Sequence, residues 1–434
     1  MKKILLIILV LLAFSIFFTA CGDKTETTTT PVTTQDPIIN LSPGLYDAEN
    51  TLLASWDELV NTYGMKADIH YDIPIYFNPP YYAPCYVLTN TSELQNGSKL
   101  VIGNIDKIGA KAFGDCTSLT SIYIPESVTL IGDGAFTGCI NLTTIMVSEN
   151  NPNYSGNGTA LYNKDKTTLI DVSESVTSFI IPNTVTSIGD RAIGGCEKLT
   201  NITISDSVTS IGIGAFAGCT SLTSITLPNS ITLIGSDAFW GCTSLTSITL
   251  PDSLNSIELY AFSDCTSLTS IAIPNSVTKI GNSAFKDCTS LTSIAIPDSV
   301  TAIDYAFGGC TNLAAIMVDE NNPNYSSDGT ALYNKDKTSL IQVPESVTSF
   351  TIPDSVTQID AGAFANCEKL TNITISDSVT SIGKSAFWGC TSLTNINFAG
   401  TVEQWNAISK GENWNKNVPA TEINCSDGTV TSLN

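Results

Sequence analysis

Cysteine is the residue type with the strongest capacity for chemistry in this chain, and it recurs at a fixed spacing. Among the 434 residues are 13 cysteines, enough for a disulfide framework or for several metal sites. From Cys196 to Cys288 each cysteine follows the last by 23 residues, and Cys310 follows after 22. Side chains repeated by translation point the same way, whereas a disulfide needs Cβ atoms turned toward each other. We therefore expect stacked, buried, reduced thiols.

Other catalytic or metal-binding arrangements find little support in the residues. His70 is the only histidine, so a catalytic triad or a histidine-rich metal site cannot be assembled, and a pair with Cys85 is the one alternative. The acidic loop at Asp319 offers oxygen ligands for calcium, but its twin has Ser148 at that place and EF-hand spacing is absent. We predict no enzyme activity, no catalytic residue, no cofactor and no metal.

The cysteines belong to a repeating unit of the form L-x-x-I-x-L-P-x-S-V-T-x-I-G-x-x-A-F-x-G-C-T-S. A fixed period of 23 residues is typical of a solenoid in which each repeat forms one coil. We expect a strand at L-T-S-I-T-L, a turn at Pro-Asp-Ser, a second extended piece at S-V-T-S-I and a tight helical turn at A-F-x-G-C. Six side chains of a coil would point inward: Leu222, Ile225, Leu227, Ile231, Ile234 and Phe239.

A single coil cannot be stable by itself. Burying six such side chains contributes about 9 to 18 kcal/mol, whereas ordering the backbone of one coil costs ~23 kcal/mol or more. Stacking on neighbouring coils must supply the difference.

The repeat unit resembles the BspA-type leucine-rich repeat of bacterial surface proteins, and the resemblance extends from about Lys99 to Cys425. The period and the resemblance together predict an α/β solenoid with short strands and short helical turns, capped at both ends. About twelve coils would occupy residues 99–398. Residues 38–98 and 399–434 resemble the caps found at the two ends of such repeats.

Within those caps we expect particular elements. GLYDAENTLLAS around Asn50 predicts a hairpin, and residues 55–64 predict a short helix, so that 38–98 would be a small α/β cap. After residue 398 a helix that carries Trp405 and Ile408 should fold over the last coil.

The first 37 residues indicate export. Residues 1–20 contain two lysines and then an apolar run, which is typical of a signal peptide. Small residues directly before Cys21 resemble the lipobox of bacterial lipoproteins, so we expect Cys21 to carry the lipid, with plain secretion as the alternative. Residues 21–37 would form a lipidated, disordered tether. The protein would then lie on the extracellular face of the bacterial membrane or on the cell surface, held by its lipid alone.

Two insertions interrupt the period between Cys139 and Cys196 and between Cys310 and Cys367, each spanning 57 residues. They are copies of one another, since NNPNYSGNGTALYNKDKTTLI recurs as NNPNYSSDGTALYNKDKTSLI 171 residues later. We expect NPNY to replace the S-V-T-x-I piece. Hairpins near 150–175 and 321–346 would be inserted at the helical turn, either as binding loops or as spacers.

Charge and resemblance narrow the choice of partner. The net charge of -22 opposes nucleic-acid binding. The resemblance implies a monomeric protein-binding or adhesion module directed at host matrix proteins, host cells or other bacteria. A carbohydrate-binding module, for which Trp240 and Trp388 are outward aromatic residues, and a structural surface layer without a ligand are the alternatives. An ice-binding array of threonines is a remote one.

One outward position of the first strand of each coil predicts where a partner would bind. Thr203, Thr226, Thr249, Thr351 and Thr374 occupy this position in five coils and Asn397 in one, but two groups of three coils carry apolar residues. The first group comprises Tyr123, Met146 and Ile180, and the second comprises Ala272, Ala295 and Met317. Apolar side chains rimmed by hydroxyl groups suit a protein partner.

Overall fold

The computed structural model describes residues 42, 44–46, 52–55, 98–103 and 105–431. The chain comprises two units, Met1–Pro37 and Ile38–Asn434. The whole of the first unit lies outside the described residues, and so do His70, Cys85 and residues 56–64 of the helix expected at 55–64, whose first residue, Ser55, ends a strand. The signal peptide, the lipidated Cys21 and the tether therefore stay predictions.

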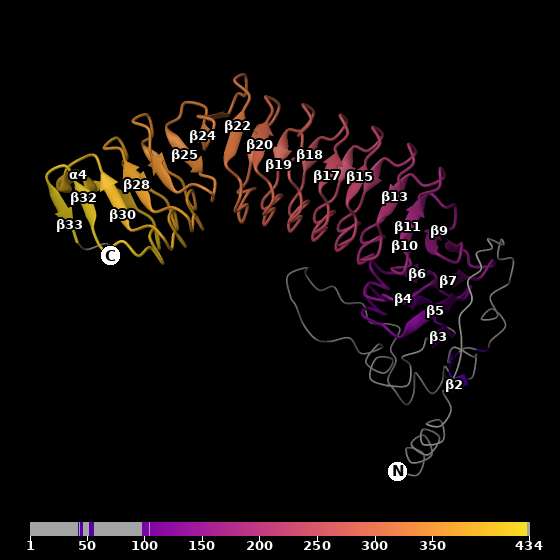
Figure 1. Cartoon of the computed structure of the whole chain (residues 1–434). Coiled ribbons are helices and arrows are strands. Elements are labelled where there is room, and N and C mark those ends of the chain that lie inside the picture. The colour runs from indigo at the N-terminus through magenta and orange to yellow at the C-terminus, as the bar shows by residue number, and fades with distance from the viewer. Residues whose placement is uncertain (1–41, 43, 47–51, 56–97, 104, 432–434) are drawn as a thin grey trace, which may run out of the picture. The chain divides into compact units, whose positions relative to one another are not determined.

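The second unit is a solenoid whose successive coils stack in sequence order (Figure 1). The L-T-S-I-T-L segments form a first strand row: β3 Ser98–Val101, β5 Leu119–Ile124, β7 Thr144–Val147, β11 Ser178–Ile180, β13 Asn201–Thr203, β15 Ser224–Thr226, β17 Ser247–Thr249, β20 Ser293–Ile296, β22 Ala315–Val318, β26 Ser349–Thr351, β28 Asn372–Ile375, β30 Asn395–Phe398 and β32 Ile423–Cys425.

The S-V-T-x-I segments form a second strand row of two-residue strands: β4 Lys107–Ile108, β6 Leu130–Ile131, β12 Ser187–Ile188, β14 Ser210–Ile211, β16 Leu233–Ile234, β18 Ser256–Ile257, β19 Lys279–Ile280, β21 Ala302–Ile303, β27 Gln358–Ile359, β29 Ser381–Ile382 and β31 Ser409–Lys410.

Equivalent residues of neighbouring coils pair in parallel, so the repeat period sets the register. In β15 and β17, Ser224 lies opposite Ser247 and Ile225 opposite Ile248. Because side chains alternate along a strand, the central Ile225 is buried while its two neighbours face outward. The six predicted inward side chains of this coil are all buried.

The core is a set of identical side chains stacked along the solenoid. Phe216 and Phe239 lie with ring centroids 5.1 Å apart and planes within 2°. The same stacking continues through Phe262 and Phe285 to Phe307. Each coil thus covers the hydrophobic face of the next, which is the stabilisation that an isolated coil lacks.

The expected helical turns are not confirmed. In the described residues, A-F-x-G-C forms successive reverse turns, such as Ala217 N–H to the Gly214 carbonyl (2.9 Å) and Cys219 N–H to the Phe216 carbonyl (3.2 Å). Gly214 and Gly218 have φ of 61° and 75°, the left-handed region that ends a helix. One such residue directly before A-F-x-G-C and one within it prevent a helix, so these coils are built of strand and turn, and the α/β class is not confirmed for them.

Serine and threonine hydroxyls bond one coil to the coil before it. In four successive Pro-x-Ser turns the serine donates to a carbonyl 22 residues earlier, as Ser230 Oγ does to the Val208 carbonyl (2.6 Å). Thr246 Oγ1 likewise donates to the Thr223 carbonyl (3.0 Å). The Thr223 carbonyl also accepts the Thr246 N–H (2.9 Å), so the hydroxyl adds a second bond between the same two coils. The high serine and threonine content therefore contributes to stacking.

The two insertions are not hairpins that project from the A-F-x-G-C turn, as predicted, but lie at the second strand row. Each is a three-stranded antiparallel meander, β8 Tyr154–Gly156, β9 Ala160–Asn163 and β10 Thr168–Val172 in the first copy, and β23 Tyr325–Ser327, β24 Leu332–Asn334 and β25 Ser339–Gln342 in the second. The last strand of each then pairs in parallel with the second row, β10 with β12 and β25 with β27. The NPNY segment lies beside β6 of the second row, because the Ile131 N–H of that strand donates to Tyr154 Oη (2.8 Å).

Both ends of the solenoid carry additional elements. β1 Gly44–Tyr46 and β2 Leu52–Ser55 form the hairpin expected around Asn50, and β1 also pairs with β3. At the other end α4 Val402–Ala407 begins with a capping box of Thr401 and Gln404 and buries Trp405. β31 and β32 continue the two rows beyond residue 398, and β33 Gly428–Val430 pairs antiparallel with β32.

Among the described residues, no helix is both long enough and apolar enough to cross a membrane.

Candidate functional site

The candidate binding face is the outer side of the first strand row. Ile180, Ala272, Ala295 and Met317 are exposed there, Ile180 at 73% and Met317 at 46%. Tyr123 and Met146 are half-buried. All six predicted residues therefore lie at the surface, although Tyr123 and Met146 are less accessible than the other four.

Two members of the second apolar group lie side by side, whereas the first group is divided. Ala295 lies directly opposite Met317 in the pairing of β20 with β22. In the first group Tyr123 lies opposite Met146, but Ile145 then pairs with Gly158 of the inserted segment. The insertion thus occupies the place beside β7 that the sequence analysis assigned to Ile180, which pairs instead with Thr203 of β13. Met146 and Ile180 therefore do not lie on neighbouring strands, and the three residues do not form one continuous surface.

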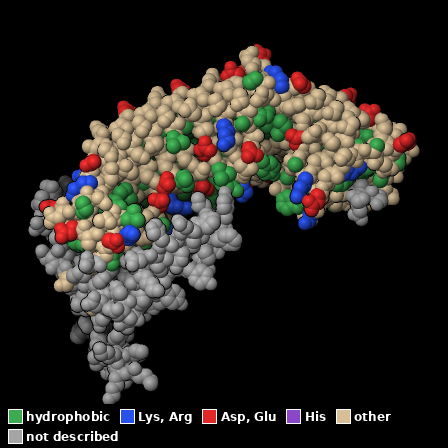
Figure 2. All heavy atoms as spheres, turned by 180° about the vertical axis from the view of Figure 1, so that it is seen from behind, with side chains coloured by type: hydrophobic (Ala, Val, Ile, Leu, Met, Phe, Trp, Pro, Cys, Tyr) green, Lys and Arg blue, Asp and Glu red, His purple; other side chains and the backbone are tan. Residues whose placement is uncertain are grey.

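The exposed surface is otherwise dominated by uncharged polar groups. On the face in Figure 2, hydrophobic side chains lie in small separate groups, with acidic and basic side chains scattered among them. Basic side chains do not gather into one patch on that face.

The repeated cysteines are buried thiols with hydrogen-bonded S–H groups. Cys242 Sγ donates to the Phe216 carbonyl (3.2 Å), and equivalent bonds recur at Cys265 and Cys288 (3.2 and 3.1 Å). Burial raises the pKa of Cys242 and of Cys288 to about 12. A thiolate is therefore strongly disfavoured, and these sulfurs are poor nucleophiles and poor metal ligands. Groups of acidic, cysteine or histidine side chains that could hold a metal ion are absent from the described residues.

One member of the cysteine series differs from the expectation. Cys116 is disulfide-bonded, while the other members from Cys139 to Cys390 are free and buried. The translation argument excludes bonds between equivalent positions of consecutive coils, and it does not apply to a cysteine of the first coil. The prediction of a wholly reduced series was wrong for Cys116.

Titration with a thiol reagent under non-reducing conditions should distinguish buried from accessible sulfurs. In the native protein we expect about one fast-reacting thiol among the described cysteines, Cys425, which is half-buried. The nine buried free thiols should react only after denaturation. Fast labelling of Cys242 in the folded protein would contradict the stacked arrangement.

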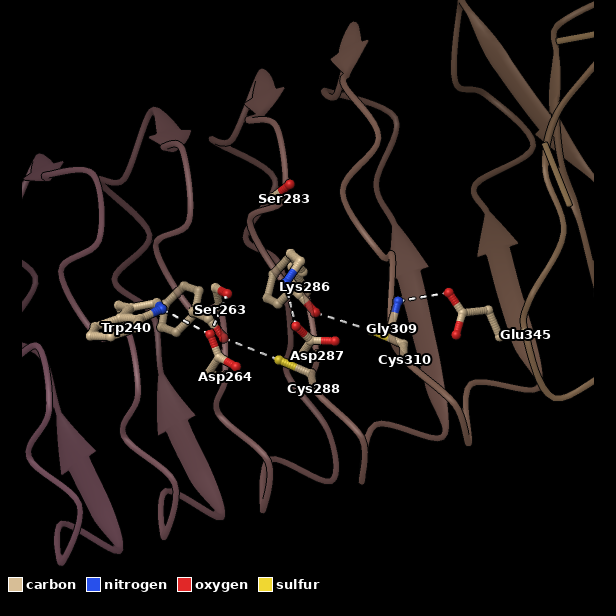
Figure 3. Close-up of polar contacts among 12 residues, drawn as sticks. Trp240, Ser263, Asp264, Ser283, Lys286, Asp287, Cys288, Gly309, Cys310 and Glu345 are labelled. Atoms are coloured by element: carbon tan, nitrogen blue, oxygen red, sulfur yellow. Dashed lines mark hydrogen bonds and ion pairs between the residues drawn. The ribbon is translucent and has the colours of Figure 1, made fainter. Parts of the chain in front are cut away.

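Sequence reasoning missed a pair of buried carboxyl groups where the insertions return to the solenoid. In an uninterrupted coil the residue before the cysteine donates its N–H to the next coil, as Gly241 does to the Ser263 carbonyl (2.9 Å). At the first insertion Gly138 N–H instead donates to Glu174 Oε1 (2.6 Å). At the second, Gly309 N–H donates to Glu345 Oε1 (2.7 Å), as Figure 3 shows. A carboxyl oxygen thus replaces a missing backbone carbonyl.

Burial makes these carboxyl groups weak acids. It raises the pKa of Glu174 to about 8, with Glu197 and Asp115 adding to the effect. It also raises the pKa of Glu345 to about 7, assisted by Asp287 and Glu368. One sequence signal could have revealed Glu174 and Glu345, because both copies of the duplication carry glutamate at this position. Nearby, Asp171 of the first copy is replaced by Gln342 in the second.

A family model matches most of the chain. The model described as "BspA type Leucine rich repeat region (6 copies)" matches residues 89–179, 170–265, 232–350 and 343–410. No curated protein matches the sequence.

Similar solved structures are bacterial leucine-rich repeat proteins. A leucine-rich repeat protein from Eubacterium ventriosum is 34% identical over 49% of this chain, with a TM-score of 0.42, and the match spans 63% of that protein's length. A leucine rich cell surface protein from Faecalibacterium prausnitzii is 24% identical, covering 78% of this chain and 98% of its own, with a TM-score of 0.39. The pneumococcal vaccine antigen PcpA is 18% identical, covering 65% and 78%, with a TM-score of 0.39.

Proposed function

The chain belongs to the family of BspA-type leucine-rich repeat proteins, and on this premise we propose that it is a lipid-anchored cell-surface protein that binds another protein. Lipid at Cys21 would hold the chain at the extracellular face, and residues 21–37 would tether the solenoid. A host matrix protein, a host cell or another bacterium would supply the partner, in keeping with the adhesion that the family resemblance implies.

The exposed apolar group on β20 and β22 carries the proposal. Ala295 and Met317 lie opposite each other, and the outward positions of two preceding strands of the row, Thr226 and Thr249, bear hydroxyl groups. Apolar side chains lose little when water leaves, and a hydroxyl rim supplies hydrogen bonds that fix orientation. Met317 adds an adaptable thioether that suits a protein surface.

The stacked coils also make the face suitable for a macromolecule. Parallel register repeats the same outward position at about the strand spacing of 4.8 Å. A ligand that spans several coils therefore meets an extended and regular surface, which is how repeat proteins commonly bind large partners.

Arginine substitutions on this face provide the test. We expect Ala295→Arg and Met317→Arg to weaken binding tenfold or more to whichever matrix protein the parent binds. Each substitution introduces a charge that must lose its water when the partner binds. Surface plasmon resonance against a panel of immobilised matrix proteins would measure the affinity. Thermal melting should change by no more than a few degrees, since both side chains are exposed.

Thr226→Arg is the matched control. Thr226 occupies the same outward position on β15, between the two apolar groups, and is exposed. It should reduce binding much less than the other two substitutions. Parent-like binding by all three variants would contradict a binding site on the first strand row.

A further inference from the structure

Three successive coils carry large polar and aromatic side chains on the surface formed by the A-F-x-G-C turns, which we call the turn ridge. Trp240 stands in the first of these coils, Asp264 in the second, and Lys286 and Asp287 in the third (Figure 3), while Ser263 of the second coil is buried. The flanking coils carry only Ala217 with Gly218, and Gly308 with Gly309, at the same positions. The large side chains at these two positions are therefore confined to three successive coils, and the coils on either side carry only alanine or glycine there.

Trp240 is oriented by a hydrogen bond to the next coil. Its indole Nε1–H donates to Asp264 Oδ2 (2.8 Å), and Ser263 Oγ donates to the same oxygen (2.9 Å). The bond fixes one edge of the ring, while Trp240 as a whole stays 48% exposed. Tryptophan is highly buried on average, so an exposed ring held in one orientation is unusual. Its exposed apolar surface is available for stacking.

Groups able to bond hydroxyls lie beside this ring. Among the described residues no hydrogen bond reaches the second oxygen of Asp264, Oδ1. Lys286 Nζ donates to Asp287 Oδ2, and the two side chains are 47% and 37% exposed. Lys286 also interacts electrostatically with Asp264 and Tyr260. At the strand spacing of about 4.8 Å, the third coil lies about 10 Å from the first.

We propose that Trp240, Asp264, Lys286 and Asp287 form a subsite for a neutral oligosaccharide. A sugar ring would lay its C–H face on the indole, and its hydroxyl groups would donate to the aspartates and accept from the lysine. Two carboxylates beside one ammonium disfavour an anionic ligand. One aromatic ring with three polar groups is also too small for a protein partner, which needs roughly 800 Å² on each side. The subsite is separate from the protein-binding face.

Trp388 supplies a matched control within the chain. It stands in the same A-F-W-G-C motif and is 39% exposed. Gly389 N–H donates to the Lys416 carbonyl as Gly241 N–H does to that of Ser263, so Asn417 occupies the place of Asp264. The described residues make no hydrogen bond to the Trp388 indole. Trp388 is therefore an exposed tryptophan without the fixed orientation and without the neighbouring carboxylates.

Titration of the full-length chain in detergent with cellotetraose, laminaritetraose and mannotetraose would test the proposal by calorimetry and by tryptophan fluorescence. We expect at least one of the three to bind with a Kd in the millimolar range or below. Trp240→Ala should weaken that binding tenfold or more, Trp240→Phe should weaken it less, and Asp264→Asn should weaken it about threefold. Trp388→Ala should leave the affinity unchanged.

Two outcomes would overturn the subsite. One is the absence of binding by all three sugars up to about 10 mM, and the other is equal loss of affinity in Trp240→Ala and Trp388→Ala. Circular dichroism would establish that the variants are folded. Ala295→Arg, on the first strand row, should bind the sugar as the parent does, so that failure of the sugar subsite and failure of the protein-binding face are distinguishable.

Discussion

Replacement of Gly235 by alanine is expected to destabilise the solenoid by roughly 3 kcal/mol, because the coils leave no room for a methyl group there. A Cβ at Gly235 would lie 2.7 Å from both the Gly212 carbonyl carbon and the Ile213 nitrogen of the preceding coil. Both contacts are backbone atoms held in the stacking ladder, so relief would require two coils to separate. Chemical denaturation, followed by circular dichroism, would measure the loss.

Gly218→Asn is the control for this substitution. Gly218 has φ of 75°, and an added Cβ would meet nothing closer than 3.8 Å. Asp264 and Asn366 already adopt φ of 60° at the equivalent place in other coils. We expect a change within about 1 kcal/mol. Equal effects of the two substitutions would contradict the close approach at Gly235.

The free energy of unfolding should fall as the pH rises from 5.5 to 8.5, which is the reverse of ordinary acid denaturation. Glu174 has a pKa of about 8 in the folded protein against an ordinary value of 4.5. The folded state therefore holds a proton that the unfolded state has released, and stability decreases with pH across this interval. Glu174 contributes a loss on the order of 3 kcal/mol, complete once the pH passes about 8. Melting temperature as a function of pH would measure it.

Glu174→Gln isolates this local effect from the general repulsion of an acidic protein. Glutamine keeps the acceptor for the Gly138 N–H but does not titrate. We expect a flatter pH profile, and Glu345→Gln should have a smaller effect because its pKa is about 7. Glu149→Gln removes the charge of an exposed carboxylate and should leave the slope as in the parent. Parallel profiles for the parent and Glu174→Gln would refute the buried carboxyl.

The sequence was most informative where each coil repeats its predecessor. A 23-residue period specifies which residues pair, so the parallel ladders and the buried Leu222, Ile225 and Phe239 could be predicted from spacing alone. The terminal features were also accessible from local patterns. The hairpin of β1 and β2 and the buried Trp405 of α4 follow from turn residues and an amphipathic pattern.

Prediction failed where backbone geometry or a break in the repeat decides the structure. A-F-x-G-C has the composition of a helical turn, but left-handed φ angles at Gly214, directly before it, and at Gly218, within it, prevent a helix. The sequence alone does not reveal the sign of φ. The insertions were misplaced because β10 and β25 enter the second row without its consensus. That displacement separated Ile180 from Met146. Glu174 was missed because its carboxyl group replaces one backbone carbonyl at the insertion only. Such a single replacement does not recur with the 23-residue period.

Oxidative footprinting with and without a bound protein partner would test the proposed binding face most directly. Met317 lies on the second apolar group of the first strand row and Trp240 on the turn ridge, and both are exposed and readily oxidised. With a retained matrix protein bound, we predict that oxidation of Met317 slows severalfold while that of Trp240 is unchanged. Unchanged oxidation of Met317 together with protection of Trp240 would contradict a protein-binding site on the first strand row.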